Sequence, residues 1–169
     1  MESSDLEPAR AAAAEAVRRL GDRRETLATA ESLTGGLVAA TIVEIPGVSS
    51  VYRGGLVVYA TDLKHALAGV PDGLLAERGP VDPDVALALA EGARRRCAAA
   101  WGAATTGVAG PDPQDGKPVG TVFVAVAGPF GATVRELKLG GNRAVIRAGT
   151  VTGVLRLLAE QLRTAPAVA

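Results

Sequence analysis

The 169-residue sequence predicts an α/β domain built on a mixed, mainly parallel sheet with helices on both faces. Three observations point to this fold class. Short runs rich in β-branched residues alternate with longer segments whose apolar residues recur at helical spacing. Gly and Pro separate most of these segments. Apolar residues make up 48% of the chain, which is enough to bury a core in a single domain over residues 1–169.

The first third predicts a helix, a strand and a second helix. Pro8 suits a first helical turn, and apolar residues then share one face as far as Leu20, where Gly21 ends the helix. A short strand is expected over 25–31. The segment Ser32-Leu-Thr-Gly-Gly36 joins this strand to a helix that runs from residue 37 to Ile45.

The middle of the chain continues the alternation. A strand is expected over 54–59 and a short helix over 61–67, with Thr61 or Asp62 as its cap. A long helix follows over 82–97, because Asp82 is a good N-cap residue and the next residue is a proline.

The last third predicts three strands and a helix. The third strand covers 101–106, and a Gly-Pro turn joins strands over 119–127 and 132–139 into a hairpin. A final helix, capped by its Asn, is expected over 142–162, and the tail 164–169 is expected to fray.

Composition excludes several classes of function. The 18 basic and 18 acidic side chains balance, which argues against a nucleic-acid binder. One cysteine allows no internal disulfide, and one histidine, His65, excludes a multi-histidine metal site. The uncharged stretches are too short and interrupted to span a bilayer, and the N-terminus is too polar for a signal peptide. We therefore expect a cytoplasmic protein without membrane or nucleic-acid partners.

Three segments that leave strands are rich in hydroxyls and glycines: 30–36, 59–64 and 105–111. In a parallel sheet, ligands bind beyond the carboxyl ends of the strands. We therefore expect these segments to form one site.

Ser32 has two interpretations. By spacing alone, an N-cap of the following helix is the commoner role of a serine. Alternatively Ser32 is a nucleophile on a tight strand-to-helix turn, where backbone N–H groups hold a phosphate or an oxyanion. The segment is not an esterase elbow, because Ala30 stands where G-x-S-x-G requires glycine.

A nucleophilic serine needs a base. His65 fits better as a solvated helix residue. Lys64 can act as a base if burial lowers its pKa, and the Tyr59 phenol could relay a proton or fix the ammonium. By spacing alone, surface positions for Lys64 and Tyr59 are the commoner outcome.

Two other patterns are weaker. Residues 106–110 form either a backbone nest for an anion or a plain turn. Arg143 and Arg147 lie four residues apart, so they either clamp a phosphate or carboxylate or form ordinary salt bridges or a subunit contact.

Taken together, four motifs in order resemble the CinA C-terminal domain family over about residues 8–162. The motifs are Ala30-Glu-Ser-Leu-Thr-Gly-Gly36, Gly54-Gly-Leu-Val-Val-Tyr59 followed by Lys64, Thr106-Gly-Val-Ala-Gly-Pro111, and Pro118-Val-Gly-Thr-Val122. Four motifs are far more specific than one, and they favour the catalytic interpretation of Ser32, Tyr59 and Lys64.

The resemblance implies a three-layer αβα domain that hydrolyses the carboxamide of nicotinamide mononucleotide without a metal or cofactor. It implies that Ser32 is the nucleophile and that Lys64, helped by Tyr59, is the base. We further expect backbone groups of Thr34, Gly35 and Gly36 to stabilise the oxyanion. The remaining expected substrate-binding residues are Thr106, Gly107, Gly110 and Arg143.

The sequence departs from the family pattern at three places. Leu33 stands where many members have Cys, Ala60-Thr61 replaces Ser-Asn, and Asp112-Pro-Gln-Asp115 replaces a glycine-rich stretch. The molybdopterin-binding-like domain of full-length members lies outside the resemblance. We expect a homo-oligomer. The alternatives are a non-catalytic nucleotide-binding module and an interaction module associated with competence or damage.

Overall fold

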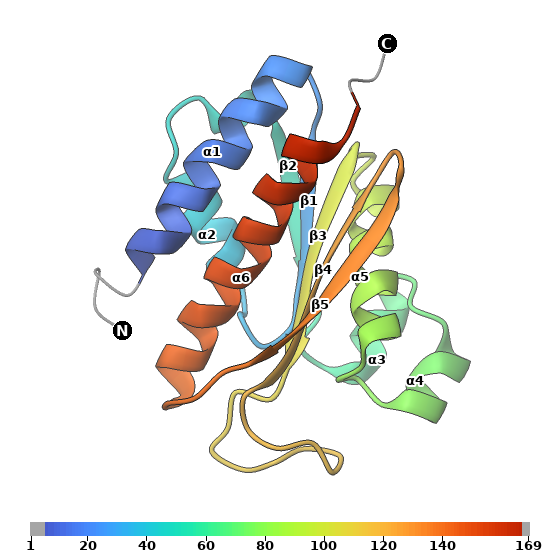
Figure 1. Cartoon of the computed structure of the whole chain (residues 1–169). Helices are drawn as coiled ribbons and strands as arrows, with labels where there is room; N and C mark the ends of the chain where they lie inside the picture. Colours follow the sequence, from blue (N-terminus) through green and yellow to red (C-terminus); the bar gives the residue numbers. More distant parts are fainter. Residues whose placement is uncertain (1–5, 167–169) are drawn as a thin grey trace.

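The computed structural model describes residues 6–166 and shows an α/β fold with three layers (Figure 1). A five-stranded sheet separates α1 and α6 on one face from α5 on the other. The fold class predicted from the sequence is confirmed. The elements, in chain order, are α1 (Glu7–Arg23), β1 (Leu27–Glu31), α2 (Leu37–Val43), the 3₁₀ helix η2 (Val48–Ser50), β2 (Tyr52–Val57), α3 (Thr61–Ala66), α4 (Asp72–Arg78), α5 (Pro83–Arg96), β3 (Trp101–Gly107), β4 (Thr121–Gly128), β5 (Gly131–Lys138) and α6 (Arg143–Thr164).

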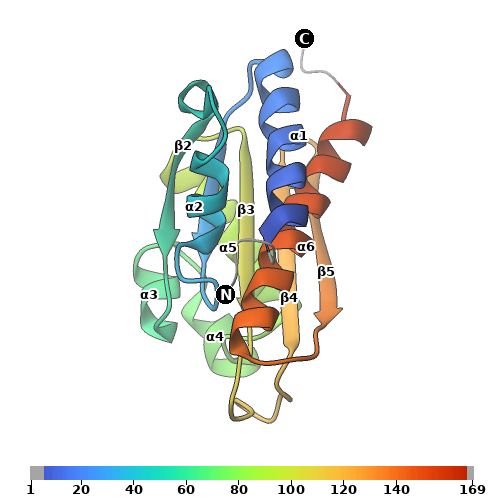
Figure 2. The same cartoon turned by 90° about the vertical axis from the view of Figure 1, so that its left-hand side faces the viewer.

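The sheet is mixed, with strand order β2-β1-β3-β4-β5. β1 pairs in parallel with both β2 and β3, whereas β4 is antiparallel to both of its neighbours. Four strands therefore share one direction and β4 alone is reversed. The loops that follow β1, β2 and β3 consequently meet at the same end of the sheet, beyond the carboxyl ends of these strands (Figure 2).

An apolar cluster lies on each side of the sheet. Leu155 and Leu158 of α6 pack with α1 against one face, and Leu89 of α5 is buried against the other. The α5 backbone comes very close to β3 at Gly102, where a Cβ atom would lie 2.0 Å from the carbonyl oxygen of Ala90. Because few core side chains are large aromatics, elements such as α5 and β3 can pack with their backbones close together.

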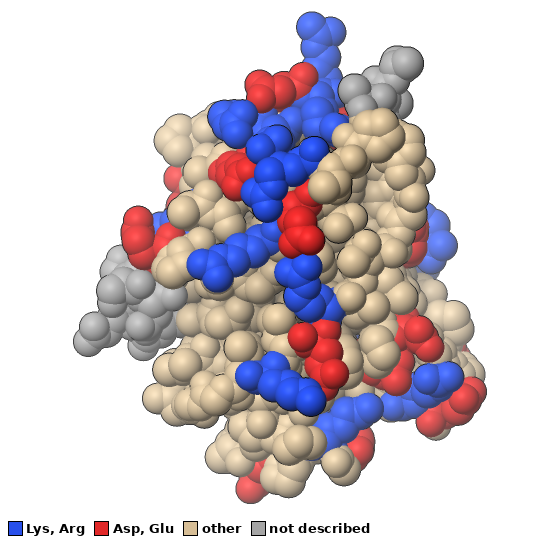
Figure 3. All heavy atoms as spheres, viewed as in Figure 1, with Lys and Arg blue, Asp and Glu red and all other residues tan. Residues whose placement is uncertain are grey.

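The outer face over α1, α6 and β5 carries interleaved charges (Figure 3). Arg135 contacts Glu160 over 3.0 Å and Arg163 contacts Glu15 over 2.9 Å, joining β5 to α6 and α6 to α1. This pairing is consistent with the balanced net charge of the sequence.

Several boundaries differ from the predicted ones. α1 continues past Gly21, an exposed position, to Arg23, and its C-cap residue Arg24 is left-handed with φ 54°. α3 has Ala60 as its N-cap residue and no side-chain cap, so the expected caps Thr61 and Asp62 were wrong. The short helices η2 and α4 were not predicted, because η2 has only three residues and α4 buries none of its residues, so it has no apolar face that would show helical periodicity.

The predicted caps of the two long C-terminal helices are confirmed. Asp82 accepts from the Asp84 amide, and Asn142 accepts from the Val145 amide. At the end of α6, Arg23 donates to the carbonyls of Ala165 and Pro166; of the expected frayed tail, residues 167–169 lie outside the described residues. Among the described helices, none is long and apolar enough to cross a membrane.

Candidate active site

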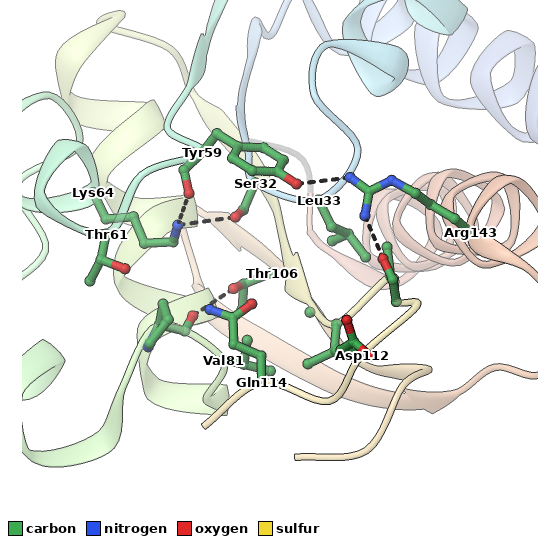
Figure 4. Close-up of a pocket in the computed structure, with 15 residues that line it drawn as sticks. Ser32, Leu33, Tyr59, Thr61, Lys64, Val81, Thr106, Asp112, Gln114 and Arg143 are labelled. Atoms are coloured by element: carbon green, nitrogen blue, oxygen red, sulfur yellow. Dashed lines mark hydrogen bonds between the residues drawn. The ribbon is translucent and has the colours of Figure 1, made fainter. Parts of the chain in front are cut away.

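A cavity of about 130 Å³ lies at the carboxyl ends of β1, β2 and β3 (Figure 4). This volume is below the usual range of small-molecule sites, about 300–1,000 Å³, so the cavity can enclose only a small group of a ligand. It is lined by Ser32, Leu33, Tyr59, Thr61, Lys64, Pro80, Val81, Thr106, Gly107, Val108, Ala109, Gly110, Asp112, Gln114 and Arg143. The location is the one expected for a ligand site in an open sheet with parallel strands.

Ser32 follows β1 directly and is fixed by the sheet. Its amide donates to the carbonyl of Thr105 at the end of β3 over 3.1 Å, and its residue is only 8% exposed. α2 begins later, with Gly36 as the N-cap residue and no side-chain cap. Ser32 therefore does not cap the helix, and its hydroxyl takes part in a different contact.

That contact is with Lys64 on α3. Lys64 Nζ donates to Ser32 Oγ over 3.0 Å and to the carbonyl oxygens of Val58 and Tyr59 over 2.8 and 3.1 Å. The lysine is 1% exposed, and this burial lowers its pKa from 10.5 to about 8. Lys64 thus carries a readily removable proton, and its nitrogen faces a hydroxyl.

The turn after Ser32 is held from two sides by residues that the sequence analysis did not place there. Glu31, 1% exposed, accepts from the amides of Gly36, Val38 and Ala39 through its two carboxylate oxygens over 2.8–3.0 Å. The N-terminal amides of α2 therefore point at a carboxylate within the chain. On the other side, Arg147 of α6 donates to the carbonyls of two turn residues, Leu33 and Thr34.

The Tyr59 side chain differs from its expected orientation. Its backbone carbonyl contacts Lys64, but its phenol oxygen accepts from Arg143 over 2.8 Å, and the residue is 57% exposed (Figure 4). Arg143 also donates to the carbonyl of Gly110 over 2.8 Å. The guanidinium of α6 therefore joins the segment after β2 to the segment after β3 at the cavity.

Thr106, Gly107 and Gly110 line the cavity as expected for its third segment. The Thr106 hydroxyl donates to the carbonyl of Pro80 over 2.6 Å, which ties the end of β3 to the segment before α5. Asp112, from the stretch that departs from the family pattern, also lines the cavity.

Thr34, Gly35 and Gly36 do not line the cavity, in contrast to the expectation. The Thr34 side chain is buried and its hydroxyl pairs with that of Thr105 over 2.9 Å. The amide of Gly35 donates to the Ser32 carbonyl, and that of Gly36 donates to Glu31. The amides of these two glycines are therefore already engaged.

Sequence reasoning missed the positions of Glu31 and Arg147. Glu31 offered one signal, because a charged residue at the end of an apolar strand needs a partner. Arg147 was recognised as part of an arginine pair, but its contacts join residues more than 110 positions apart in the chain. Within residues 6–166, no group of three or more His, Cys, Asp or Glu side chains is arranged to hold a metal ion.

Fold and site together define an α/β domain with a buried serine–lysine pair in a cavity at the strand ends. Residues 9–162 match the CinA C-terminal domain family, and the chain belongs to that family.

Curated relatives include a CinA-like protein of Frankia casuarinae, 48% identical over 147 residues, which covers 87% of this chain and 34% of that protein. The chain spans about a third of the length of the first such relatives. The crystal structure of competence/damage inducible protein CihA from Agrobacterium tumefaciens is 34% identical, with a TM-score of 0.88, and covers 93% of this chain and 96% of that one. The competence damage-inducible protein A from Klebsiella pneumoniae is 28% identical, with a TM-score of 0.90 and coverage of 94% and 99%.

Proposed function

We propose that the protein is an amidohydrolase with Ser32 as nucleophile and Lys64 as general base, acting on the carboxamide of nicotinamide mononucleotide. The observation that carries the proposal is the 3.0 Å contact between Lys64 Nζ and Ser32 Oγ in a buried position. A lysine activates a serine only when it is neutral, and burial moves its pKa towards neutrality.

The two carbonyls beside Lys64 support this role. A neutral amine has two hydrogens and one lone pair, and the carbonyls of Val58 and Tyr59 can each accept one of those hydrogens. The remaining direction is the one towards Ser32, so the lone pair faces the hydroxyl. Deprotonated Lys64 is thus oriented to accept the hydroxyl proton.

The chemistry then follows in balanced steps. The Ser32 proton passes to Lys64 Nζ as Oγ attacks the amide carbon, and the carbonyl electron pair moves to oxygen. Collapse of this tetrahedral adduct expels the amine nitrogen, which takes the proton from Lys64 and leaves as ammonia. Water then gives a proton to Lys64 and attacks the ester carbon. Collapse releases the acid and returns the proton to Ser32.

The substrate is proposed from the family and from the cavity. The CinA C-terminal domain family includes amidases. Arg143 places a guanidinium at the cavity that can bind a phosphate. Thr106, Gly107 and Gly110 line the same cavity and would contact the nucleotide.

The test is the release of ammonia and nicotinic acid mononucleotide from nicotinamide mononucleotide. Wild-type protein is expected to release both, and Ser32→Ala and Lys64→Met are expected to abolish release while remaining folded by circular dichroism. Lys138→Met, which changes an exposed lysine outside the cavity, serves as the control. No release by wild type, or equal release by Ser32→Ala, would refute the proposal.

A further inference from the structure

The proposed hydrolysis requires hydrogen-bond donors for the oxyanion of the tetrahedral adduct, and the turn after Ser32 limits which amides can supply them. The N-terminus of α2 is not available, because Glu31 accepts from Gly36, Val38 and Ala39. The amide of Gly35 donates to the Ser32 carbonyl over 3.0 Å. These contacts leave the amides of Leu33 and Thr34, for which the described part of the chain offers no acceptor.

The direction of the Thr34 amide is fixed from the opposite side by Arg147. Arg147 Nε donates to the Leu33 carbonyl over 3.0 Å, and Arg147 Nη2 donates to the Thr34 carbonyl over 2.7 Å. In a trans peptide the carbonyl and the N–H point in opposite directions, and the cis bond of the described chain lies elsewhere. With the Leu33 carbonyl held towards Arg147, the N–H of Thr34 points away from it.

The Leu33 amide is fixed by the same logic. It shares a peptide plane with the Ser32 carbonyl, which accepts from Gly35 inside the turn. The N–H of Leu33 therefore points out of the turn. Leu33 lines the cavity, whereas Thr34, which is fully buried, and Arg147 do not.

We infer that the amide of Leu33 is the oxyanion-hole donor of this turn and that Arg147 is the positioning residue that holds the turn in the productive orientation. That an oxyanion forms at all rests on the proposed function. Which amide stabilises it is argued from the hydrogen bonds of the turn. This assignment replaces the expectation that Thr34, Gly35 and Gly36 supply the donors. If Arg147 is lost, the Leu33–Thr34 peptide is free to rotate, and the neighbouring Leu33 amide is no longer held in place.

The test compares Arg147→Met and Arg147→Lys with Arg156→Met, which changes an exposed arginine on the same helix. Removal of one oxyanion-hole donor lowers kcat by about 100-fold or more. We expect Arg147→Met to lower kcat by about that factor with KM within about threefold of wild type, Arg147→Lys to lower it less, and added guanidinium ion to restore part of the loss. A lower melting temperature with kcat unchanged would show a purely structural role and overturn the inference.

A second readout does not depend on the nucleotide. Diisopropyl fluorophosphate labels activated serines through an adduct whose oxygen is also stabilised by the donors of the oxyanion hole. Arg147→Met is therefore expected to slow labelling of Ser32 at least tenfold. If wild type is labelled but does not hydrolyse the nucleotide, the proposed substrate fails while this comparison still decides the role of Arg147. Equal labelling rates in wild type and Arg147→Met, or no labelling of wild type, would overturn it.

Should Arg147→Met not fold, the donor itself can be removed. Replacing Leu33 by leucic acid through semisynthesis converts the Ser32–Leu33 amide to an ester and deletes one N–H. Labelling of Ser32 at least tenfold slower than in the matched synthetic wild type supports the assignment. An unchanged labelling rate contradicts it.

Discussion

The phenol of Tyr59 accepts a hydrogen bond from Arg143 over 2.8 Å, and the amine of Lys64 instead contacts the Tyr59 backbone carbonyl. The tyrosine side chain is therefore connected to the proposed substrate-binding arginine and not to the base. Proton transfer from Ser32 to Lys64 consequently needs no phenol.

Tyr59→Phe separates these two roles. The substitution keeps the backbone carbonyl that contacts Lys64 but removes the acceptor for Arg143, so we expect KM for nicotinamide mononucleotide to rise several-fold with kcat within about threefold of wild type. Steady-state kinetics beside Lys64→Met measures this. A loss of kcat as large as that of Lys64→Met would instead place the phenol in the proton transfer.

The lowered pKa of Lys64 predicts the pH dependence of the reaction. Because the neutral amine is the active form, kcat/KM is expected to rise about tenfold per pH unit below pH 8 and to level off above it. Lys64→Arg, which cannot lose its proton at these pH values, is expected to be inactive up to pH 10. A profile that does not change between about pH 6 and 9 would contradict the assignment.

The same burial predicts a pH-dependent stability. Between about pH 8 and 10.5, folded Lys64 is neutral while the unfolded chain still binds its proton, so stability rises with pH in this window. The difference in free energy of unfolding between wild type and Lys64→Met should increase by about 3 kcal/mol from pH 7 to 10.5. Urea unfolding at several pH values measures it. Lys138→Met, at an exposed position, is the matched control for the loss of a lysine side chain.

Most of the fold was predictable because its signals are local. Asp82 and Asn142 cap the helices that their sequence context indicates, and the β-branched runs predicted all five strands to within two residues at each end. The end of α1 was missed by three residues. An exposed Gly21 adds only a small helix penalty of about 1 kcal/mol, which the packing of α1 on α6 overcomes.

The site was predictable in its location but not in its internal contacts. Strand ends identified three of its segments, since parallel strands end at one edge. The burial of Lys64 could not be predicted from the sequence, because the short charged helix 61–66 has a composition typical of solvent-exposed helices. The orientation of Tyr59 follows from alternation: Val58 is fully buried, so its neighbour points outward. The contacts of Arg147 depend on tertiary packing between α6 and the turn.

The close packing around Gly102 predicts that adding a side chain there destabilises the protein strongly. A Cβ atom there would lie 2.0 Å from the Ala90 carbonyl oxygen, and α5 cannot move away without losing its contacts with β3. Gly102→Ala is expected to destabilise the protein by about 3 kcal/mol. Gly73→Ala on α4 meets no atom within 4 Å and is expected to stabilise by about 0.5–1 kcal/mol. Equal melting temperatures for the two variants would contradict the close approach of α5 to β3.

Glu31 gives the last prediction, because one buried carboxylate accepts from three amides at the start of α2. Glu31→Gln keeps the size of the side chain but replaces one acceptor oxygen by an NH₂ group that faces backbone N–H donors. Hydrogen bonds to charged groups contribute about 1.5–3 kcal/mol, so we expect a loss of about 2 kcal/mol in urea unfolding. Glu77→Gln is the matched control, since its ion pair with Arg78 lies on the exposed surface, where such pairs add little to stability. Similar losses in both variants would mean that Glu31 does not hold the turn that carries Ser32.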